Sequence, residues 1–162
     1  GLLQTSNTGV HTLASTTFTG NLVYDDFVTT MFKASAFVAR RGTWLMSSDV
    51  FCEVLKIKTT DGVPLFSNVN PGNLSGGQPG TILGRPIEVS EVMPGYANDG
   101  NAKPVFAYGD FKMLILGDRK RFAVDFSDDA GFENATRKMR VMERMAVAIP
   151  VPTAFAICKT KA

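Results

Sequence analysis

The sequence contains few of the residues that build catalytic and metal sites. Its 162 residues include one histidine and two cysteines. Cys52 and Cys158 lie far apart and in no metal-ligand spacing, so we expect two reduced, packed thiols, with a disulfide left open. His11 lies in a polar N-terminal segment with no carboxylate or cysteine nearby, so we expect a surface or loop histidine. The sequence therefore predicts no hydrolytic triad.

Long apolar runs and a strong charge imbalance are also missing. Uncharged apolar runs such as residues 145–149 are too short to span a bilayer, and residues 1–30 lack the pattern of a signal peptide. Seventeen Lys+Arg face fifteen Asp+Glu, and the net charge of +2 does not indicate a nucleic-acid binder by itself. We therefore expect no membrane partner. Because the chain opens at Gly1 without an initiator methionine, we expect upstream sequence to be missing.

Two further segments fall short of a binding motif. Residues 76–80 are rich in glycine but lack the Lys-Ser/Thr of a phosphate loop. Asp128, Asp129 and Glu133 lack the spacing of a calcium loop, so a solvated acidic turn is expected. The sequence predicts no catalytic residue, no metal, no cofactor and no small-molecule substrate.

The hydrophobic pattern predicts one α+β domain with two helices followed mostly by antiparallel strands. Asp25 and Asp26 open the first helix, over residues 24–38, whose core stripe is Tyr24, Phe27, Val28, Met31, Phe32, Phe37 and Val38. Residues 42–46 form a short strand that carries Trp44, the single tryptophan, as a core anchor. Ser47 and Ser48 then cap a second helix with Phe51, Val54 and Leu55 on one face.

Turns and short apolar runs fill the rest of the chain. We expect a tight turn at residues 61–62, an arm of a small hairpin at 63–66, and polar loops at 68–80 and 95–103. Strands are predicted at residues 87–92, 104–108, 112–116, 121–126 and 154–158. From residue 138 to 149 apolar side chains alternate with Lys138, Arg140 and Arg144, which predicts a long strand with one basic face.

Two basic clusters are the candidate interaction sites. Their members could neutralise phosphates or pair with a partner's carboxylates. Neither cluster interleaves with aromatic residues as single-strand binders do, so a solvated or interface face of a sheet is the default interpretation. The subunit-interface or DNA-facing candidates are Arg119, Lys120, Arg121, Arg137, Lys138, Arg140 and Arg144.

Several short motifs occur in one order along nearly the whole chain. They are Trp44-Leu45-Met46-Ser47, Asp61-Gly62-Val63-Pro64-Leu65-Phe66, Leu83-Gly84-Arg85-Pro86-Ile87, Tyr108-Gly109-Asp110-Phe111, Glu143-Arg144-Met145-Ala146-Val147 and Pro152-Thr153-Ala154-Phe155. In this order the chain resembles the C-terminal portion of tailed-bacteriophage major capsid proteins of the Hong Kong 97 type. The Gly84-Arg85-Pro86 block is the most telling part.

The resemblance implies a Hong Kong 97-like capsid fold, with an axial domain built on a central antiparallel or mixed sheet flanked by two helices. Residues 1–118 and 150–162 would form the axial domain, and residues 119–149 the long returning strand of the peripheral domain. The family's N-terminal portion has no counterpart here, so the peripheral domain would be incomplete. Family members that cross-link use an Asn and a Glu, which align with Ala135 and Met142, so the chemistry should be absent.

The implied function is that of a non-enzymatic structural subunit of the icosahedral head shell of a tailed phage or prophage. Its partners would be other copies of itself, in hexamers and pentamers, and packaged double-stranded DNA on the inner face is a further candidate. It would reside in the virion, and in the host cytoplasm during assembly. Two alternatives stay open, an encapsulin-like nanocompartment shell and a small α+β enzyme.

Overall fold

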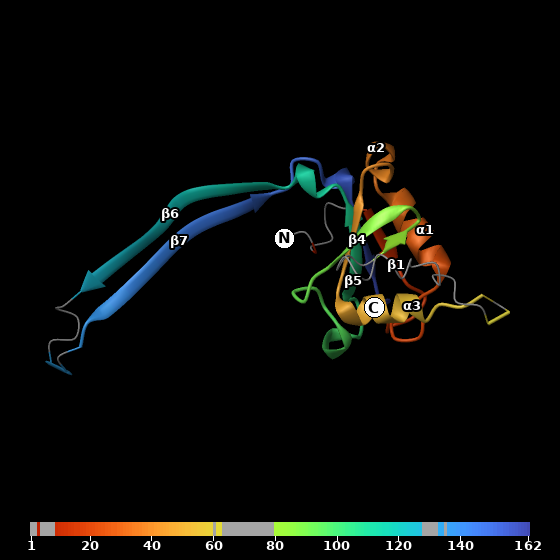
Figure 1. The fold of residues 1–162 in the computed structure, drawn as a ribbon, viewed down its shortest axis with the longest axis horizontal. Helices are drawn as coiled ribbons and strands as arrows, with labels where there is room; N and C mark the ends of the chain where they lie inside the picture. Colours follow the sequence, from red (N-terminus) through yellow and green to blue (C-terminus); the bar gives the residue numbers. More distant parts are fainter. Residues whose placement is uncertain (1–2, 4–8, 60, 63–79, 128–132, 135) are drawn as a thin grey trace. The chain divides into compact units, whose positions relative to one another are not determined.

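The computed structural model describes residues 3, 9–59, 61–62, 80–127, 133–134 and 136–162, without the side chains of Lys120 and Arg121. The chain divides into two compact units, which are Gly1–Met113 with Val151–Ala162, and Leu114–Pro150 (Figure 1). The predicted hairpin arm at 63–66, the glycine-rich segment up to residue 79, and Asp128 and Asp129 lie outside the described residues.

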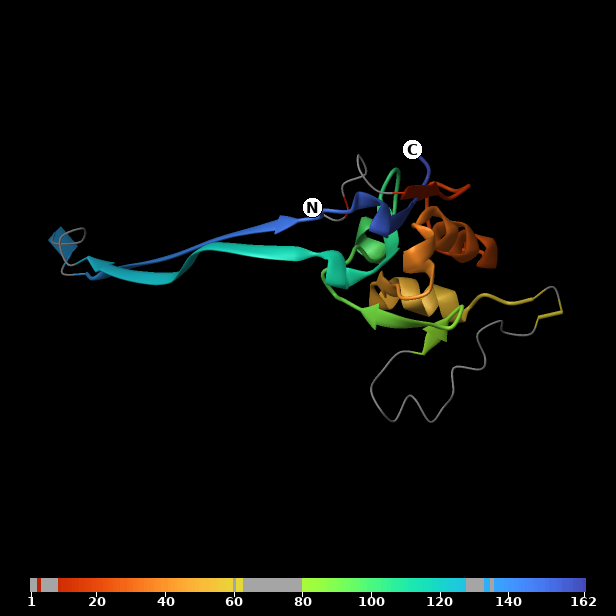
Figure 2. The same cartoon turned by 90° about the horizontal axis from the view of Figure 1, so that it is seen from above.

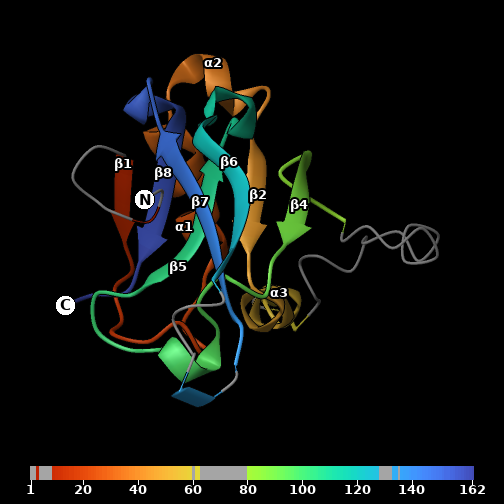
Figure 3. The ribbon, with the colours of Figure 1, turned by 90° about the vertical axis from the view of Figure 1, so that its left-hand side faces the viewer.

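The first unit is built on a six-stranded mixed sheet with the order β1-β8-β5-β2-β4-β3 (Figure 3). β1 pairs with β8 and β2 with β4 in parallel, and the other pairs are antiparallel. This arrangement confirms the predicted α+β class with a mixed sheet. The strands are β1 (Gly9–Thr12), β2 (Thr43–Met46), β3 (Thr81–Ile82), β4 (Arg85–Val89), β5 (Pro104–Gly109) and β8 (Phe155–Lys159).

The segment predicted as one helix over residues 24–38 forms two helices, α1 (Tyr24–Lys33) and α2 (Ala36–Ala39). The prediction of a continuous helix is wrong because Ala34 and Ser35 are extended. The backbone N–H of Ser35 donates to the carbonyl of Thr153 at 2.9 Å, so a contact distant in sequence replaces the helical hydrogen bond. Helix periodicity alone does not reveal such a contact.

The third helix, α3 (Ser48–Leu55), begins as predicted. The Ser47 side chain accepts a hydrogen bond from the backbone N–H of Val50 at 3.3 Å, which satisfies one of the free donors at the helix start. The Ser47 hydroxyl also donates to the carbonyl of Pro94 at 3.0 Å. The cap therefore ties the helix to the segment that follows β4.

An aromatic cluster between α1 and the sheet forms the centre of the core. Phe27 of α1 stacks on Phe106 with 4.7 Å between ring centroids, and Trp44 lies against both rings and against Tyr108. All four side chains are fully buried. The indole N–H of Trp44 donates to the carbonyl of Ile82 at 3.0 Å, which confirms Trp44 as a core anchor.

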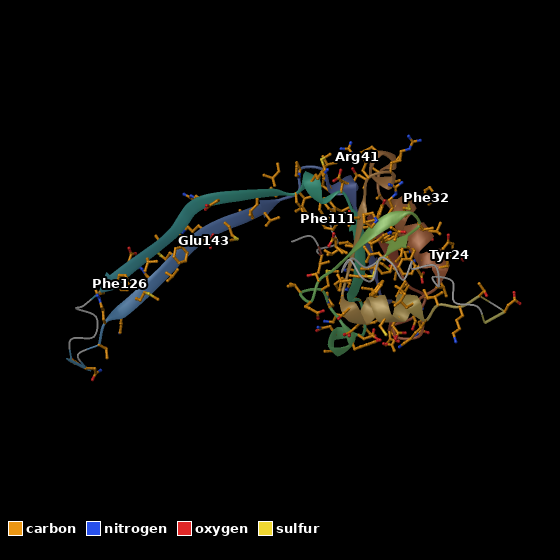
Figure 4. The ribbon with its side chains drawn as sticks, viewed as in Figure 1. Tyr24, Phe32, Arg41, Phe111, Phe126 and Glu143 are labelled. Carbon is orange, nitrogen blue, oxygen red and sulfur yellow. The ribbon has the colours of Figure 1, made fainter. Side chains whose placement is uncertain are left out.

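Two phenylalanines predicted for the core are on the surface. Phe32 of α1 is 76% exposed and Phe37 of α2 is 44% exposed. Phe32 lies within α1, five residues after Phe27, on a different side of the helix from the buried Phe27 and Thr30. Phe37 follows the break after α1, so the helical stripe does not continue to it. Both residues leave apolar surface on the outer side of the helices, where Figure 4 labels Phe32.

His11 has a structural partner, contrary to the prediction of a surface or loop histidine without one. It lies in β1, and its Nε2 is 2.8 Å from Oδ1 of Asp26 in α1. Cys158 is aligned with His11 across the β1–β8 pair. Burial raises the pKa of the Cys158 thiol, which keeps it protonated, so this histidine, aspartate and cysteine do not form an activated nucleophile. Both cysteines are free as expected, but Cys52 is exposed, not packed.

The Gly84-Arg85-Pro86 motif has a local structural role. Leu83 and Gly84 both have positive φ values, 52° and 70°, and form the turn between β3 and β4. The Arg85 guanidinium donates to the carbonyl of Arg40, at the end of α2. The motif thus links the edge of the sheet to the end of a short helix.

The second unit is a two-stranded antiparallel ribbon of β6 (Ile115–Ser127) and β7 (Lys138–Ala148), which run side by side in Figures 1 and 2. β7 confirms the long strand predicted from the period of two. The separate strands predicted at 112–116 and 121–126 are wrong, because Phe111–Met113 is a short 3-10 helix and one strand follows it. The register shifts at two points of β6, between Asp118 and Lys120 and between Lys120 and Ala123.

Candidate subunit interface

One face of the β6–β7 ribbon carries large apolar side chains. In β7 these side chains alternate with the basic ones, and the register places three apolar partners from β6 on the same face. Asp118 is the partner of Met145, and Phe122 lies at the second shift of register. Each of the eight is between 40% and 67% exposed. We call this set the apolar face; it consists of Leu116, Phe122, Val124, Phe126, Met139, Val141, Met145 and Val147.

The opposite face of the ribbon is basic. Lys138, Arg140 and Arg144 of β7 are all exposed there, and we call these three residues the basic face. Arg144 is aligned with Lys120 of β6, so the register brings the two clusters that are separate in sequence onto neighbouring strands. Oδ2 of Asp125 accepts a hydrogen bond from Arg140 at 3.0 Å in an exposed ion pair, which contributes little stability.

The remaining basic candidates are not all on this face. Arg119 is exposed on β6 at the first shift of register. Arg137 precedes β7, and its guanidinium lies 4.8 Å from the centroid of the Phe126 ring, in a cation–π contact. The side chains of Lys120 and Arg121 are outside the described part of the chain. The role of all seven as interface or DNA-facing residues stays a prediction.

In the first unit, the predicted loop at residues 95–103 is fixed to α3. The Tyr96 hydroxyl donates to Oε1 of Glu53 at 2.7 Å, and the Tyr96 backbone N–H donates to Asp49 at 2.9 Å. Asp99 accepts from the backbone of Phe18 at 2.8 Å. These contacts hold a loop with a short 3-10 helix, Tyr96–Asn98, in a defined position. A defined loop can serve as a contact surface without the entropy cost of ordering it.

Glu53 is the centre of this network. Burial opposes ionisation of its carboxyl, yet hydrogen bonds from Lys56, from the Tyr96 hydroxyl and from the Gly20 backbone hold its pKa below the ordinary value. The hydrogen bond to Glu53 raises the pKa of Tyr96 to about 12. The carboxylate therefore stays charged and binds three groups from three segments of the chain.

A shallow cavity of about 340 Å³ lies over the outer part of the sheet in the first unit. Leu45 and Phe111 provide apolar lining, and charged side chains of both signs surround them. Figure 4 labels Arg41 and Phe111. The lining consists of Arg41, Thr43, Leu45, Glu88, Asp110, Phe111 and Lys112.

The described residues contain no cluster of three or more His, Cys, Asp or Glu side chains suited to hold a metal ion. Within the same ranges, no helix is both long enough and apolar enough to cross a membrane. Sequence reasoning found the basic face but missed the apolar face as a surface. The alternation of apolar side chains in β7 was visible, but it was interpreted only as a long strand with one basic face.

The fold and its surfaces define a structural class of protein: a mixed α+β unit with anchored loops and a ribbon whose exposed faces suit contact with partners. A family model described as the phage capsid family matches residues 1–160. The chain belongs to the phage capsid family, a family of shell proteins, which confirms the resemblance inferred from the ordered motifs. No match was found among curated protein sequences.

Solved capsid structures share the fold. The capsid of an empty GTA particle is 19% identical with a TM-score of 0.76, and the match covers 100% of this chain and 56% of that one. A chain from Mycobacterium phage Che8 is 13% identical with a TM-score of 0.67, and the match covers 97% of this chain and 54% of the phage chain. The mature capsid of bacteriophage PhiM1 is 19% identical with a TM-score of 0.62, and the match covers 93% of this chain and 51% of the PhiM1 chain. The chain thus spans about half the length of these solved chains.

Proposed function

We propose that this chain is part of a subunit of a tailed-phage head shell, acting as a structural element and not as an enzyme. Its partners are other copies of the same subunit, arranged in hexamers and pentamers. The family supports this proposal. The observation that carries it is the apolar face, because eight exposed large apolar side chains on one ribbon mark a contact surface and not a solvent face.

Shell assembly needs only modest contacts between neighbours. Repeated interfaces close by symmetry, and each subunit is held by several neighbours at once. We assign residues 1–118 and 150–162 to the axial domain around the vertices, and residues 119–149 to the peripheral domain. The anchored loop at 95–103 would contact a neighbouring axial domain. Assembly would take place in the host cytoplasm, and the finished shell is part of the virion.

The subunit expressed alone from its complete gene tests this function. Electron microscopy of the purified protein should show closed icosahedral shells or their hexameric and pentameric components. Persistent monomers at concentrations where capsid proteins assemble would contradict the proposal.

The basic face would contact either packaged DNA or a neighbouring subunit. Replacing Arg140 and Arg144 by glutamate reverses its charge without altering the apolar face. If the face contacts DNA, empty shells should form normally and DNA-filled shells should become rare; if it contacts a subunit, assembly itself should weaken and depend more strongly on salt. Unchanged assembly, packaging and salt sensitivity would exclude both roles.

A further inference from the structure

The anchored loop before β5 is held in two halves, and carboxylates fix the first half. The Tyr96 hydroxyl donates to Glu53 of α3 at 2.7 Å, and the Tyr96 backbone N–H donates to Asp49 at 2.9 Å. The carboxylate of Asp99 accepts hydrogen bonds from the backbone N–H groups of residues 18–19. The negative charge of each acceptor strengthens these bonds. The attachment of the first half therefore depends on groups that acid can neutralise.

Neutral groups fix the second half of the loop to the residues that follow β8. The backbone N–H of Lys103 donates to the Thr160 hydroxyl at 2.8 Å, and this hydroxyl donates to the carbonyl of Gly100. The backbone N–H of Ala102 donates to the carbonyl of Lys161 at 3.0 Å. Backbone amides, carbonyls and threonine hydroxyls keep the same charge from acid to neutral pH. The two halves of the loop meet just before Gly100, and acid acts on the first of them.

Glu53 is the buried carboxylate that ties the first half to two other segments. Its Oε1 accepts from Tyr96 and Lys56, both at 2.7 Å, and its Oε2 accepts from the backbone N–H of Gly20 at 2.9 Å. Lys56 and Cys52 on α3 and Tyr96 in the loop are the titratable groups that interact here. Burial opposes ionisation of Glu53, yet its hydrogen bonds hold its pKa below the ordinary 4.5. The carboxylate therefore keeps its charge above pH 4.5 and loses it as the pH falls through the lower folded-state pKa.

We propose that Glu53 is an acid-sensitive switch: protonation of its carboxylate loosens residues 96–99 from α3, leaves residues 100–103 in place, and so changes the surface that the loop offers to a neighbouring subunit. The last step rests on the proposed function. The Phe18 ring stacks on the Tyr96 ring with 5.7 Å between centroids, and acid does not weaken this apolar contact. The first half therefore loosens without unfolding.

Amide hydrogen exchange in the 162-residue chain, followed residue by residue by NMR, tests the switch. The Gly20 and Tyr96 amides report on the first half, and the Ala102 and Lys103 amides report on the second half. E53Q places an uncharged group of the same size in the switch. At about pH 6 it should speed exchange at Gly20 and Tyr96 at least about fivefold, and at Ala102 and Lys103 less than about twofold.

Two comparisons separate the switch from a general loss of stability. E91Q, at an exposed glutamate in the segment after β4, is the matched control and should leave all four rates within about twofold of wild type. In wild type, exchange at Gly20, corrected for its intrinsic pH dependence, should speed up between about pH 6 and pH 3.5, because this amide donates to Glu53 itself. In E53Q the corrected rate should stay nearly constant over that range.

Equal acceleration at all four amides in E53Q, or a Gly20 rate in wild type that does not respond to acid, would overturn the switch. The wild-type pH series decides the question even where E53Q does not fold. In shells formed from the complete gene, E53Q should lower the fraction of assembled protein at neutral pH more than E91Q does, and equal fractions would overturn the link to subunit contact. The exchange experiment needs no shells, so a wild-type subunit that never assembles would contradict the proposed function and not the switch.

Discussion

Replacing two phenylalanines of α1, one at a time, separates the core of the first unit from its outer surface. Phe27 is fully buried and stacks on Phe106 at 4.7 Å, whereas Phe32 is 76% exposed on the same helix. Truncating a buried phenylalanine to alanine typically costs about 3–5 kcal/mol, through lost transfer energy and the cavity that remains. A surface substitution away from special features changes stability by no more than about 0.5 kcal/mol. We therefore expect F27A to lower the free energy of unfolding several times more than F32A.

Urea denaturation monitored by tryptophan fluorescence and far-UV circular dichroism measures this difference. Trp44 is the single tryptophan, and its ring centroid lies 5.7 Å from that of Phe27. Its fluorescence emission therefore reports on the unit that contains both residues. Far-UV circular dichroism gives an independent midpoint, because removing Phe27 also changes the surroundings of Trp44. Equal losses of stability in the two variants would refute the assignment of Phe27 to the core and of Phe32 to the surface.

Three further predictions concern single side chains. The pKa of Glu53 in the folded chain is lowered from 4.5, so its carboxylate stabilises the fold above that pH and loses this contribution as the pH falls. The free energy of unfolding should therefore drop more from about pH 5 to pH 3 in the wild type than in E53Q. Parallel pH curves for the two proteins would contradict this prediction. S47A should lower the free energy of unfolding by about 1 kcal/mol, measured by thermal or urea denaturation, because α3 loses its N-terminal cap. S48A, the neighbouring control, should lower it much less. A thiol reagent should modify exposed Cys52 at once and buried Cys158 only at the rate of unfolding, and simultaneous modification would contradict the structure.

The periodic parts of the fold were predictable from sequence because a single rule governs them. β7 follows from the alternation of apolar and polar side chains, and the start of α3 follows from the capping chemistry of Ser47. Trp44 was predictable as a core residue because it lies in an apolar segment between helices and is large.

The parts that could not be predicted depend on contacts between distant segments. The break after α1 comes with a hydrogen bond between Ser35 and Thr153, and Phe37 beyond it is on the surface. The partner of His11 is 15 residues away on a helix that packs beside its strand. The two basic clusters were visible separately, but only the register of β6 and β7 places Lys120 opposite Arg144. Long-range pairing of this kind has no local sequence signal.

Solvent accessibility of the apolar face in assembled shells tests the central claim most directly. Met139, 62% exposed on this face, can be replaced by cysteine in a background where Cys52 is serine. The new thiol should react rapidly with a maleimide in the 162-residue chain and at least about tenfold more slowly in shells formed from the complete gene. Equal labelling rates in the two forms would show that assembly leaves the apolar face uncovered and would contradict this account.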